Sequence, residues 1–249
     1  MLRIGYHVSI SGGLELSFDR AEEVGCTSMQ IFLGGPRNWN LRGISKDEIG
    51  KFSRRAGSAD VRPVIVHMPY LPNLASPHME IFEKSLESLS AHAQRCGELG
   101  IRYLVAHLGS SMGKGKDEGI RNVVNAINSA EIPKGVTLLM ENQARHQNSV
   151  GASLEDLRGI YSGIVRKNVG FCIDTCHLFA SGYDIRDANT VEQIDKALNT
   201  YASFAYILVS VPSRAELVFC IVYMEQMYVL QSKGFVYLLY CIRITYVVS

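Results

Sequence analysis

The sequence predicts an α/β fold, a (β/α)8 TIM barrel whose last two βα units are divergent or incomplete. The chain has 249 residues, and a barrel of this kind typically takes about 250. Short apolar segments alternate with helical ones at intervals of roughly 30–40 residues, the length of one βα unit. Most of the apolar segments also end in a polar residue of a type that can bind a metal. In a barrel, the ends of the strands come together at one mouth.

The apolar segments are interpreted as parallel strands because their apolar residues are continuous, as in strands buried on both faces. An open doubly wound sheet would show the same alternation with helices, but it would spread the polar strand ends along one edge. The predicted strands are Leu2–Tyr6, Ser28–Leu33, Pro63–His67, Tyr103–His107, Thr137–Glu141 and Val169–Asp174.

The first two helical segments have recognisable ends. Leu14–Val24 is followed by Gly25, the residue type that favours the left-handed conformation of a C-terminal cap. Ser45 and Glu48 have the spacing of a capping box, which predicts the start of the second helix.

Similar signals delimit the later helices. The third helix, Met79–Leu99, is expected to end at Gly100. The remaining helices are expected at Lys116–Ala130, after the pair Ser153 and Asp156, and after the pair Thr190 and Gln193.

Composition limits the kinds of partner and compartment. The net charge is +1, so bulk charge does not indicate nucleic-acid binding and any DNA contact must come from local Arg and Lys. The six cysteines form no CxxC pair and no targeting segment precedes the first strand, which favours free thiols in a reducing compartment. We therefore expect an intracellular protein, cytoplasmic, or nuclear or mitochondrial in a eukaryote.

The chain changes character near Tyr201. Residues 201–249 hold seven of the twelve tyrosines and contain no His and no Asp. Their apolar runs, Leu217–Met224 and Phe235–Ile242, are shorter than the roughly 20 residues that span a bilayer, so no membrane association is expected. We divide the chain into a barrel at residues 1–200 and an apolar segment at 201–249, in the same domain or as a non-native tail.

Three strand ends carry a set of metal-binding side chains. His67, His107 and Glu141 end three successive predicted strands. Two histidines and a carboxylate are the usual ligands of a hydrolytic zinc ion, with water as a further ligand. The zinc lowers the pKa of that water to about 7, which produces a nucleophile at neutral pH.

Asp174 and His177 suggest a second metal close to the first. They are three residues apart where a strand gives way to a helix, so both can face the barrel mouth. Clustered metals suit phosphodiester cleavage because they stabilise the attacking and the leaving oxygen.

Other polar residues near these segments have simpler interpretations. Cys176 is expected to be a small residue packed beneath the site. His7 ends the first strand, where it lines the mouth or makes a structural hydrogen bond. His92 is on a helix and is expected to be solvated.

Two loops carry residues suited to DNA. Arg37 and Trp39 follow the second strand, and Tyr70 and Leu71 follow the third. An exposed aromatic and an apolar side chain beside a metal site suit insertion into a base stack, and Arg37 suits a phosphate. Ordinary loop packing is the alternative for all four.

Seven segments resemble the endonuclease IV family of zinc-dependent barrel nucleases that cut DNA at abasic sites. The resemblance covers Met1 to about Thr200. The matching segments are GYHVSISGGL (Gly5–Leu14), PRNW (Pro36–Trp39), HMPYLPNLASP (His67–Pro77), RCGELGI (Arg95–Ile101), HLGS (His107–Ser110), LLMEN (Leu138–Asn142) and GFCIDTCHLFASGYD (Gly170–Asp184).

The resemblance implies roles for these residues in a three-zinc site. His67, His107 and Glu141 would hold one zinc, Glu141 would bridge to a second zinc bound by Asp174, and His177 would hold a third. As a shared ligand, Glu141 is the predicted catalytic residue. Arg37, Trp39, Tyr70 and Leu71 would bind double-stranded DNA at an abasic nucleotide that is flipped out of the duplex.

The implied reaction is hydrolysis of the phosphodiester 5′ to the abasic site in base excision repair, by a monomer. The chain departs from the family pattern because no histidine follows His177, so it supplies a complete protein shell for only one zinc. Two alternatives stay open. One is an inactive, truncated or DNA-binding-only relative, and the other is a sugar isomerase or epimerase of the same barrel class.

Overall fold

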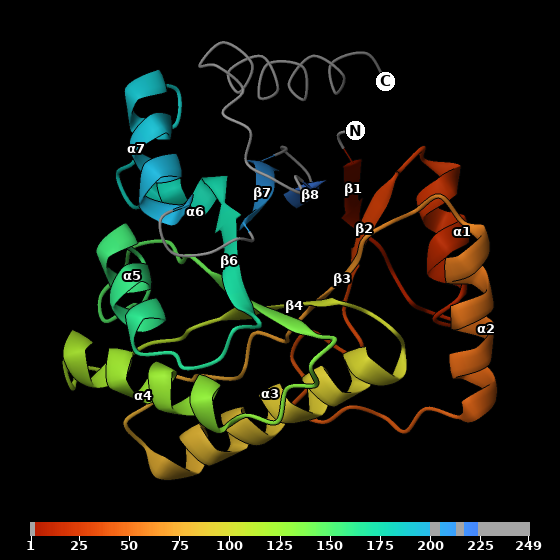
Figure 1. Cartoon of the computed structure of the whole chain (residues 1–249), viewed down its shortest axis with the longest axis horizontal. Helices are drawn as coiled ribbons and strands as arrows, with labels where there is room; N and C mark the ends of the chain where they lie inside the picture. The colour runs from red at the N-terminus through yellow and green to blue at the C-terminus, as the bar shows by residue number, and fades with distance from the viewer. Residues whose placement is uncertain (1–2, 200–204, 213–216, 224–249) are drawn as a thin grey trace.

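Eight strands form a closed barrel in the computed structural model, which describes residues 3–199, 205–212 and 217–223 (Figure 1). The α/β barrel class predicted from the sequence is confirmed. The elements in chain order are β1 (Arg3–His7), α1 (Leu16–Glu23), β2 (Ser28–Ile31), α2 (Lys46–Ser58), β3 (Val64–His67), α3 (Met79–Glu98), β4 (Tyr103–His107), α4 (Lys116–Ser129), β5 (Thr137–Glu141), α5 (Leu154–Ser162), β6 (Val169–Asp174), α6 (Thr175–Ala180), α7 (Ala188–Asn199), β7 (Ala205–Pro212) and β8 (Leu217–Tyr223).

The first seven strands are parallel, each paired with its neighbour in the sequence. The bounds of β4, β5 and β6 are those predicted. Strand β1 ends one residue later than predicted, so His7 belongs to it, and its predicted first residue, Leu2, lies outside the described residues. Strand β2 ends at Ile31 before the predicted Leu33. The β4–β5 register pairs His107 directly with Glu141, which brings two predicted ligands together.

The last strand runs the other way. Strand β8 pairs antiparallel with both β7 and β1, and this pairing closes the barrel. Only residues 213–216 separate β7 from β8. A parallel connection needs a dozen or more residues, so a strand that returns after four must be antiparallel. The prediction that the last βα units are divergent is confirmed, because a hairpin stands in their place.

Alternate residues of the strands face the two sides of the barrel wall. One buried cluster, which includes Leu104, Leu138 and Phe171, packs with apolar residues of the surrounding helices. A smaller cluster lies inside the barrel and consists of Ile65, Tyr103, Val105, Leu139 and Cys172. Since side chains alternate along a strand, the residue two positions after each inner residue also faces inward. Two positions after Ile65, Val105, Leu139 and Cys172 stand the predicted ligands His67, His107, Glu141 and Asp174, so the strand period positions the ligand set above the inner core.

The described helices lie on either side of the strands and below them in the view of Figure 1. Ser45 and Glu48 form the predicted capping box at the start of α2. The Ser153 hydroxyl accepts a hydrogen bond from the Asp156 N–H at the start of α5, as the spacing of this pair predicts. None of the described helices is both long and apolar enough to cross a membrane.

Helix α7 begins earlier than predicted. Its first residue is Ala188, and the Asp187 carboxylate accepts hydrogen bonds from the Thr190 N–H and hydroxyl. Thr190 therefore lies inside the helix, and the predicted start at Thr190 and Gln193 is wrong. The physical reason is that Asp187, three residues earlier, is itself a strong N-cap and accepts from the Thr190 N–H, so the helix begins before Thr190 can act as its cap.

The prediction of a solvated His92 is also wrong. His92 is 2% exposed, and its Nδ1 donates to the Ser88 carbonyl 2.7 Å away. This face of α3 packs on the barrel, and a bond to its own helix satisfies the ring where water is excluded. Cys26, Cys96, Cys172 and Cys176 are free thiols, as expected. The side chains of Cys220 and Cys241 lie outside the described part of the chain, and the division at residue 200 stays a prediction.

Candidate metal centre at the barrel mouth

The ends of β3, β4 and β5 bring together two imidazoles and a carboxylate. His67 Nε2 lies 3.0 Å from Glu141 Oε2, and His107 Nε2 lies 3.4 Å from the same oxygen. One ligand atom from each of the three residues lies within 4.8 Å of the others. His67 and Glu141 are buried, and His107 is half-buried. The set predicted from the sequence is therefore assembled in space.

The ring of His67 is oriented for a cation. Its Nδ1 lies 2.6 Å from the Met68 carbonyl oxygen, which can only accept, so Nδ1 carries the proton. Its Nε2 then faces the Glu141 oxygen, another acceptor. A proton or a metal ion must lie between two such atoms for their approach to be favourable. A histidine that donates its other N–H to a backbone carbonyl is the common arrangement of a metal ligand.

Glu141 is 2% exposed and ionised. Burial alone would raise the pKa of its carboxyl, but the charges and hydrogen bonds of His107 and His67 outweigh burial and lower the pKa below its usual value. A buried carboxylate surrounded by imidazoles is an oxygen donor for a divalent metal.

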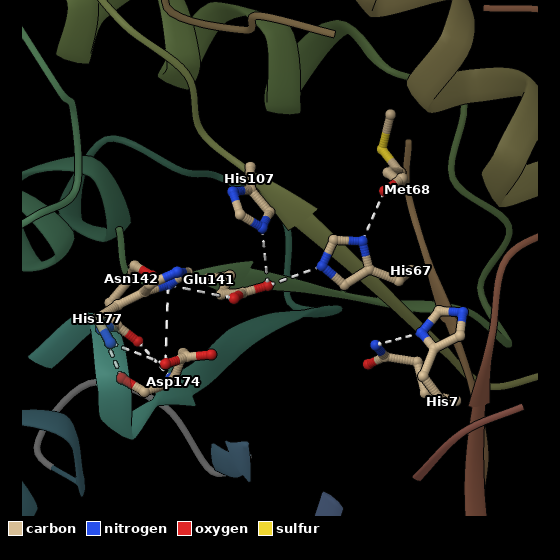
Figure 2. Close-up of polar contacts among 9 residues, drawn as sticks. His7, His67, Met68, His107, Glu141, Asn142, Asp174 and His177 are labelled. Atoms are coloured by element: carbon tan, nitrogen blue, oxygen red, sulfur yellow. Dashed lines mark hydrogen bonds and ion pairs between the residues drawn. The ribbon is translucent and has the colours of Figure 1, made fainter. Parts of the chain in front are cut away.

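A second group shares Glu141 with Asp174 and His177 (Figure 2). His177 Nδ1 lies 3.4 Å from Glu141 Oε1 and 4.0 Å from Asp174 Oδ1. Asp174 caps α6, because its Oδ1 accepts a hydrogen bond of 2.8 Å from the His177 N–H. The end of β6 therefore fixes both predicted ligands beside the first group.

Asn142 supports this second group and was not predicted as a site residue. Its side chain accepts from the Asp174 N–H at 2.6 Å and donates to the Asp174 carbonyl at 3.1 Å. Its own carbonyl accepts from His177 Nδ1 at 2.8 Å, which leaves His177 Nε2 with the lone pair. The signal in the sequence is an amide directly after a ligand at the end of a buried strand, where its polar groups need partners.

His7 belongs to an aromatic group beside the first histidine pair. Gln30 Nε2 donates to His7 Nδ1 at 3.1 Å, and the His7 ring lies 4.2 Å from that of Phe32. Burial, aided by the nearby charge of His67, lowers the pKa of His7 to about 4, so the ring is neutral at pH 7. The sequence left two interpretations of His7 open, a place in the lining of the mouth or a structural hydrogen bond, and the structural hydrogen bond is observed. Phe32, which also contacts the rings of His67 and Tyr70, was not predicted.

The loop after β3 carries exposed side chains next to the ligands. Tyr70 is 51% exposed and Leu71 is 38% exposed. The Tyr70 ring lies 5.7 Å from that of His67 and 5.6 Å from that of His107. Burial, followed by the charges of Glu141 and Asp174, raises the pKa of Tyr70, so its hydroxyl keeps its proton.

The loop after β2 lies against the same place. The Tyr70 N–H donates to the Pro36 carbonyl at 2.9 Å, which ties the two loops together next to Arg37. Arg37 is exposed. Trp39 is half-buried, and Lys84 of α3 lies over its ring at 4.8 Å.

The thiol beneath the two groups belongs to Cys172. It is buried inside the barrel, and burial raises its pKa well above the usual value, so it stays protonated. Cys176 is half-exposed on α6 and belongs to neither ligand group. The side chains of residue 195 and of residues after 197 lie outside the description, so the ligand groups are defined only among the others.

Comparisons with known proteins agree on one family. Residues 18–210 match the family model of xylose isomerase-like TIM barrels. The chain is 48% identical over 188 residues to a probable endonuclease 4 of Cenarchaeum symbiosum, covering 74% of this chain and 67% of that protein. It is 44% identical over 207 residues to a probable endonuclease 4 of Methanoculleus marisnigri, covering 80% and 73%.

Solved structures show the same fold. Endonuclease IV of Thermus thermophilus superposes with a TM-score of 0.71 at 30% identity, over 81% of this chain and 74% of that one. A D-tagatose 3-epimerase-like protein superposes with a TM-score of 0.65 at 20% identity, over 83% and 75%. At that lower identity the likeness concerns the fold alone.

Proposed function

The chain belongs to the endonuclease 4 family of xylose isomerase-like TIM barrels, and we propose that it is a zinc-dependent enzyme that hydrolyses the phosphodiester 5′ to abasic sites in duplex DNA. Membership of the family makes it a DNA-cleaving hydrolase. The substrate, the metal and the residues that act on them are the proposal.

One observation carries the proposal. Two groups of potential metal ligands share the Glu141 carboxylate, and an exposed Tyr70 lies against the two histidines of the first group. Shared ligands place metals close to each other, which suits a phosphodiester. An exposed ring at the edge of such a site suits a gap in a base stack.

The residues fit zinc. Two imidazole nitrogens and a carboxylate oxygen are a common protein set for a hydrolytic zinc, and the His67 ring is held with its free lone pair toward Glu141. When bound, zinc supplies Lewis-acid chemistry that stabilises charge on phosphate oxygens and lowers the pKa of water. His67, His107 and Glu141 would hold one ion. Glu141, Asp174 and His177 would supply a partial set for others.

The chain's own residues orient the reaction. Glu141 is the proposed catalytic residue, because its carboxylate belongs to both ligand groups, beside which the scissile phosphate would lie. Asn142 holds Asp174 and His177 in position through three hydrogen bonds. The half-buried rings of Phe32 and His7 pack beside His67 and would limit access of water from the β1 side.

The loops would bind the damaged duplex. Tyr70 and Leu71 would enter the DNA at the abasic nucleotide, which stacks poorly and is the easiest to flip out. Arg37 would contact a backbone phosphate, and Trp39 would support that loop from its place under Lys84. The product of the proposed hydrolysis would carry a 3′-hydroxyl that a polymerase can extend. We expect a monomer that acts inside the cell, where DNA is repaired.

The two alternatives have weaker support. Relatives named endonuclease 4 are 40–48% identical to the chain, whereas the epimerase structures are 13–20% identical and share only the fold. One observation supports an inactive or DNA-binding-only protein: no histidine follows His177, so the chain departs from the family pattern of metal ligands.

Product analysis tests the proposal. The zinc-loaded chain is incubated with an end-labelled duplex that has one abasic site, and with the undamaged duplex as control. We expect one cut on the 5′ side of the lesion, with a 3′ end that a polymerase extends. Binding without a cut would instead support the DNA-binding-only alternative, and absence of both would return the epimerase class to consideration.

A further inference from the structure

The loops that follow β2, β3, β4 and β5 form a rim at the mouth of the barrel. The rim consists of residues 32–45, 68–78, 108–115 and 142–153. Its first two loops are joined at Tyr70, as described above. The Asn73 amide joins the next two, because it donates to the Ser110 carbonyl at 3.0 Å and accepts from the Ser110 N–H at 2.9 Å. The Ser111 N–H donates to the Asn148 carbonyl at 2.9 Å, so hydrogen bonds connect the rim from end to end.

The rim carries positive charge and no carboxylate. Its lysines and arginines are Arg37, Arg42, Lys114 and Arg145. The whole chain has 24 acidic residues, but none lies in the rim, and the ligand carboxylates of the mouth are buried below it. Arg42 pairs with Glu48 at 2.6 Å. Arg37, Lys114 and Arg145 form no ion pair with another described residue, so their charges are available to an anion.

Lys114 lies in a turn of the loop after β4. Its N–H donates to the Ser111 carbonyl at 3.0 Å, and its side chain is exposed. The nearby Lys116 is different, because its ammonium lies 3.1 Å from the buried Asp156 carboxylate. Two acidic residues follow in the first turn of α4, where they stabilise the positive end of that helix. Lys114 is therefore the cation that this loop presents to solvent.

Arg145 lies beside a second turn, in the loop after β5. The Ser149 hydroxyl closes this turn, because it accepts from the His146 N–H at 3.2 Å and donates to the His146 carbonyl at 3.0 Å. Asn148 has a φ of 70°, which asparagine adopts more readily than most residues. All four residues from Arg145 to Asn148 are exposed. Since this turn is bonded to the loop after β4, the turns of Lys114 and Arg145 are neighbours.

The width of the rim matches the spacing of phosphates in a duplex. Neighbouring strands lie about 4.8 Å apart, so β2 and β5 are separated by at most about 15 Å along the barrel wall. Each strand of DNA carries a phosphate about every 3.4 Å along the helix axis. A duplex whose lesion lies at Arg37 and Tyr70 would therefore bring flanking phosphates to the turns of Lys114 and Arg145.

We propose that the loops after β4 and β5 bind the sugar–phosphate backbone of the duplex that flanks the lesion, with Lys114 and Arg145 each against a phosphate. The identity of the partner rests on the proposed function. The inference adds a DNA contact on loops that carry neither a metal ligand nor a residue that enters the lesion. Phosphate contacts do not read bases, so both side chains should strengthen binding to damaged and undamaged duplexes alike.

Fluorescence anisotropy with an abasic duplex and its undamaged counterpart, over a series of salt concentrations, tests the inference. Lys114→Gln and Arg145→Gln should each weaken binding to both duplexes by about 5- to 10-fold near 0.1 M salt, and each should reduce the salt slope by about one. Lys114→Arg keeps the charge and should retain the slope. Lys167→Gln, in the loop before β6 at the opposite end of the barrel, is the matched control and should change neither quantity.

Thermal melting shows whether each variant is folded. Unchanged salt slopes in Lys114→Gln and Arg145→Gln, or losses no larger than that of Lys167→Gln, would overturn the inference and leave cleavage at an abasic site untouched. A loss that persists in Lys114→Arg would also contradict a phosphate contact by Lys114. A chain that binds with the expected salt dependence but does not cut would overturn the proposed reaction alone, and a chain that binds neither duplex would overturn both.

Discussion

Glu141 contacts the imidazoles of His67, His107 and His177 through its two carboxylate oxygens. No other described residue belongs to both ligand groups. Its position follows from the sequence, because it ends a buried strand next to a strand that ends in His107. A carboxylate at that depth is stable only when cations or donors surround it.

Glu141→Gln should lower the affinity for zinc by more than about 100-fold, because losing a ligand costs more than the 10–100-fold of a supporting residue. Competition with a chromophoric chelator measures this affinity. Glu155→Gln on the exposed face of α5 removes the same charge away from the site and should leave the affinity unchanged. Equal affinities in the two variants would show that Glu141 holds no metal.

Tyr70→Ala and Leu71→Ala should each weaken binding to an abasic duplex by about 10-fold, because stacking on a base step contributes on the order of 1–3 kcal/mol. Fluorescence anisotropy at equal zinc content measures the binding. Val165→Ala, an apolar residue that is more exposed than either, is the control. Unchanged affinity in both loop variants would favour a small-molecule substrate.

His7 should make the stability of the metal-free chain depend on pH. The pKa of His7 is about 4 in the folded chain, whereas the ordinary value for a histidine is 6.5. Between those values the unfolded chain binds a proton that the folded chain does not, so stability present above about pH 6.5 is lost as pH falls toward 4.

The loss attributable to His7 should reach at most about 3 kcal/mol. Urea unfolding of the wild type and of His7→Gln across this range measures it. Other titrating groups, such as His92, are common to both proteins and cancel in the difference. Parallel pH profiles for the two proteins would contradict the lowered pKa of His7.

At the scale of elements, the ends of strands and helices could be predicted from local sequence signals wherever only one such signal was present. The capping box at Ser45 and Glu48 predicts the start of α2 because both hydrogen bonds are local. The start of α7 was missed because Asp187 and Thr190 are both good caps, and the helix begins after the earlier one. His92 was missed for a related reason, since helical periodicity alone did not identify the buried face of α3.

Ser45→Ala should reduce the free energy of unfolding by about 1 kcal/mol, because it removes an N-cap acceptor. The Ser45 hydroxyl accepts from the Glu48 N–H in the folded chain. Ser53→Ala in the interior of the same helix is the matched control, and it should be neutral or slightly stabilising. Urea denaturation measures both, and equal effects would mean that the cap does not stabilise α2.

The whole molecule shows where sequence reasoning reached its limit. Parallel strands, their order and the ligand set at their ends follow from a repeated βα pattern and a strand period of two. The closing hairpin of β7 and β8 does not follow from the sequence, because a run of apolar residues does not indicate the direction of a strand. Pairing across the barrel decides that direction, and such pairing is non-local. The hydrogen bond between Asn142 and Asp174 and the ring contact between Phe32 and His67 also join residues far apart in the sequence, so they could not be predicted from it.

Incision of a duplex with one abasic site, followed while zinc is added back to the chelated chain, tests the central claim most directly. We predict that the DNA stays intact without metal and is cut 5′ to the lesion once zinc is restored. The Glu141→Gln variant should leave it intact at the same zinc concentration. A folded, zinc-loaded chain that does not cut, or a cut that needs neither zinc nor Glu141, would contradict the account.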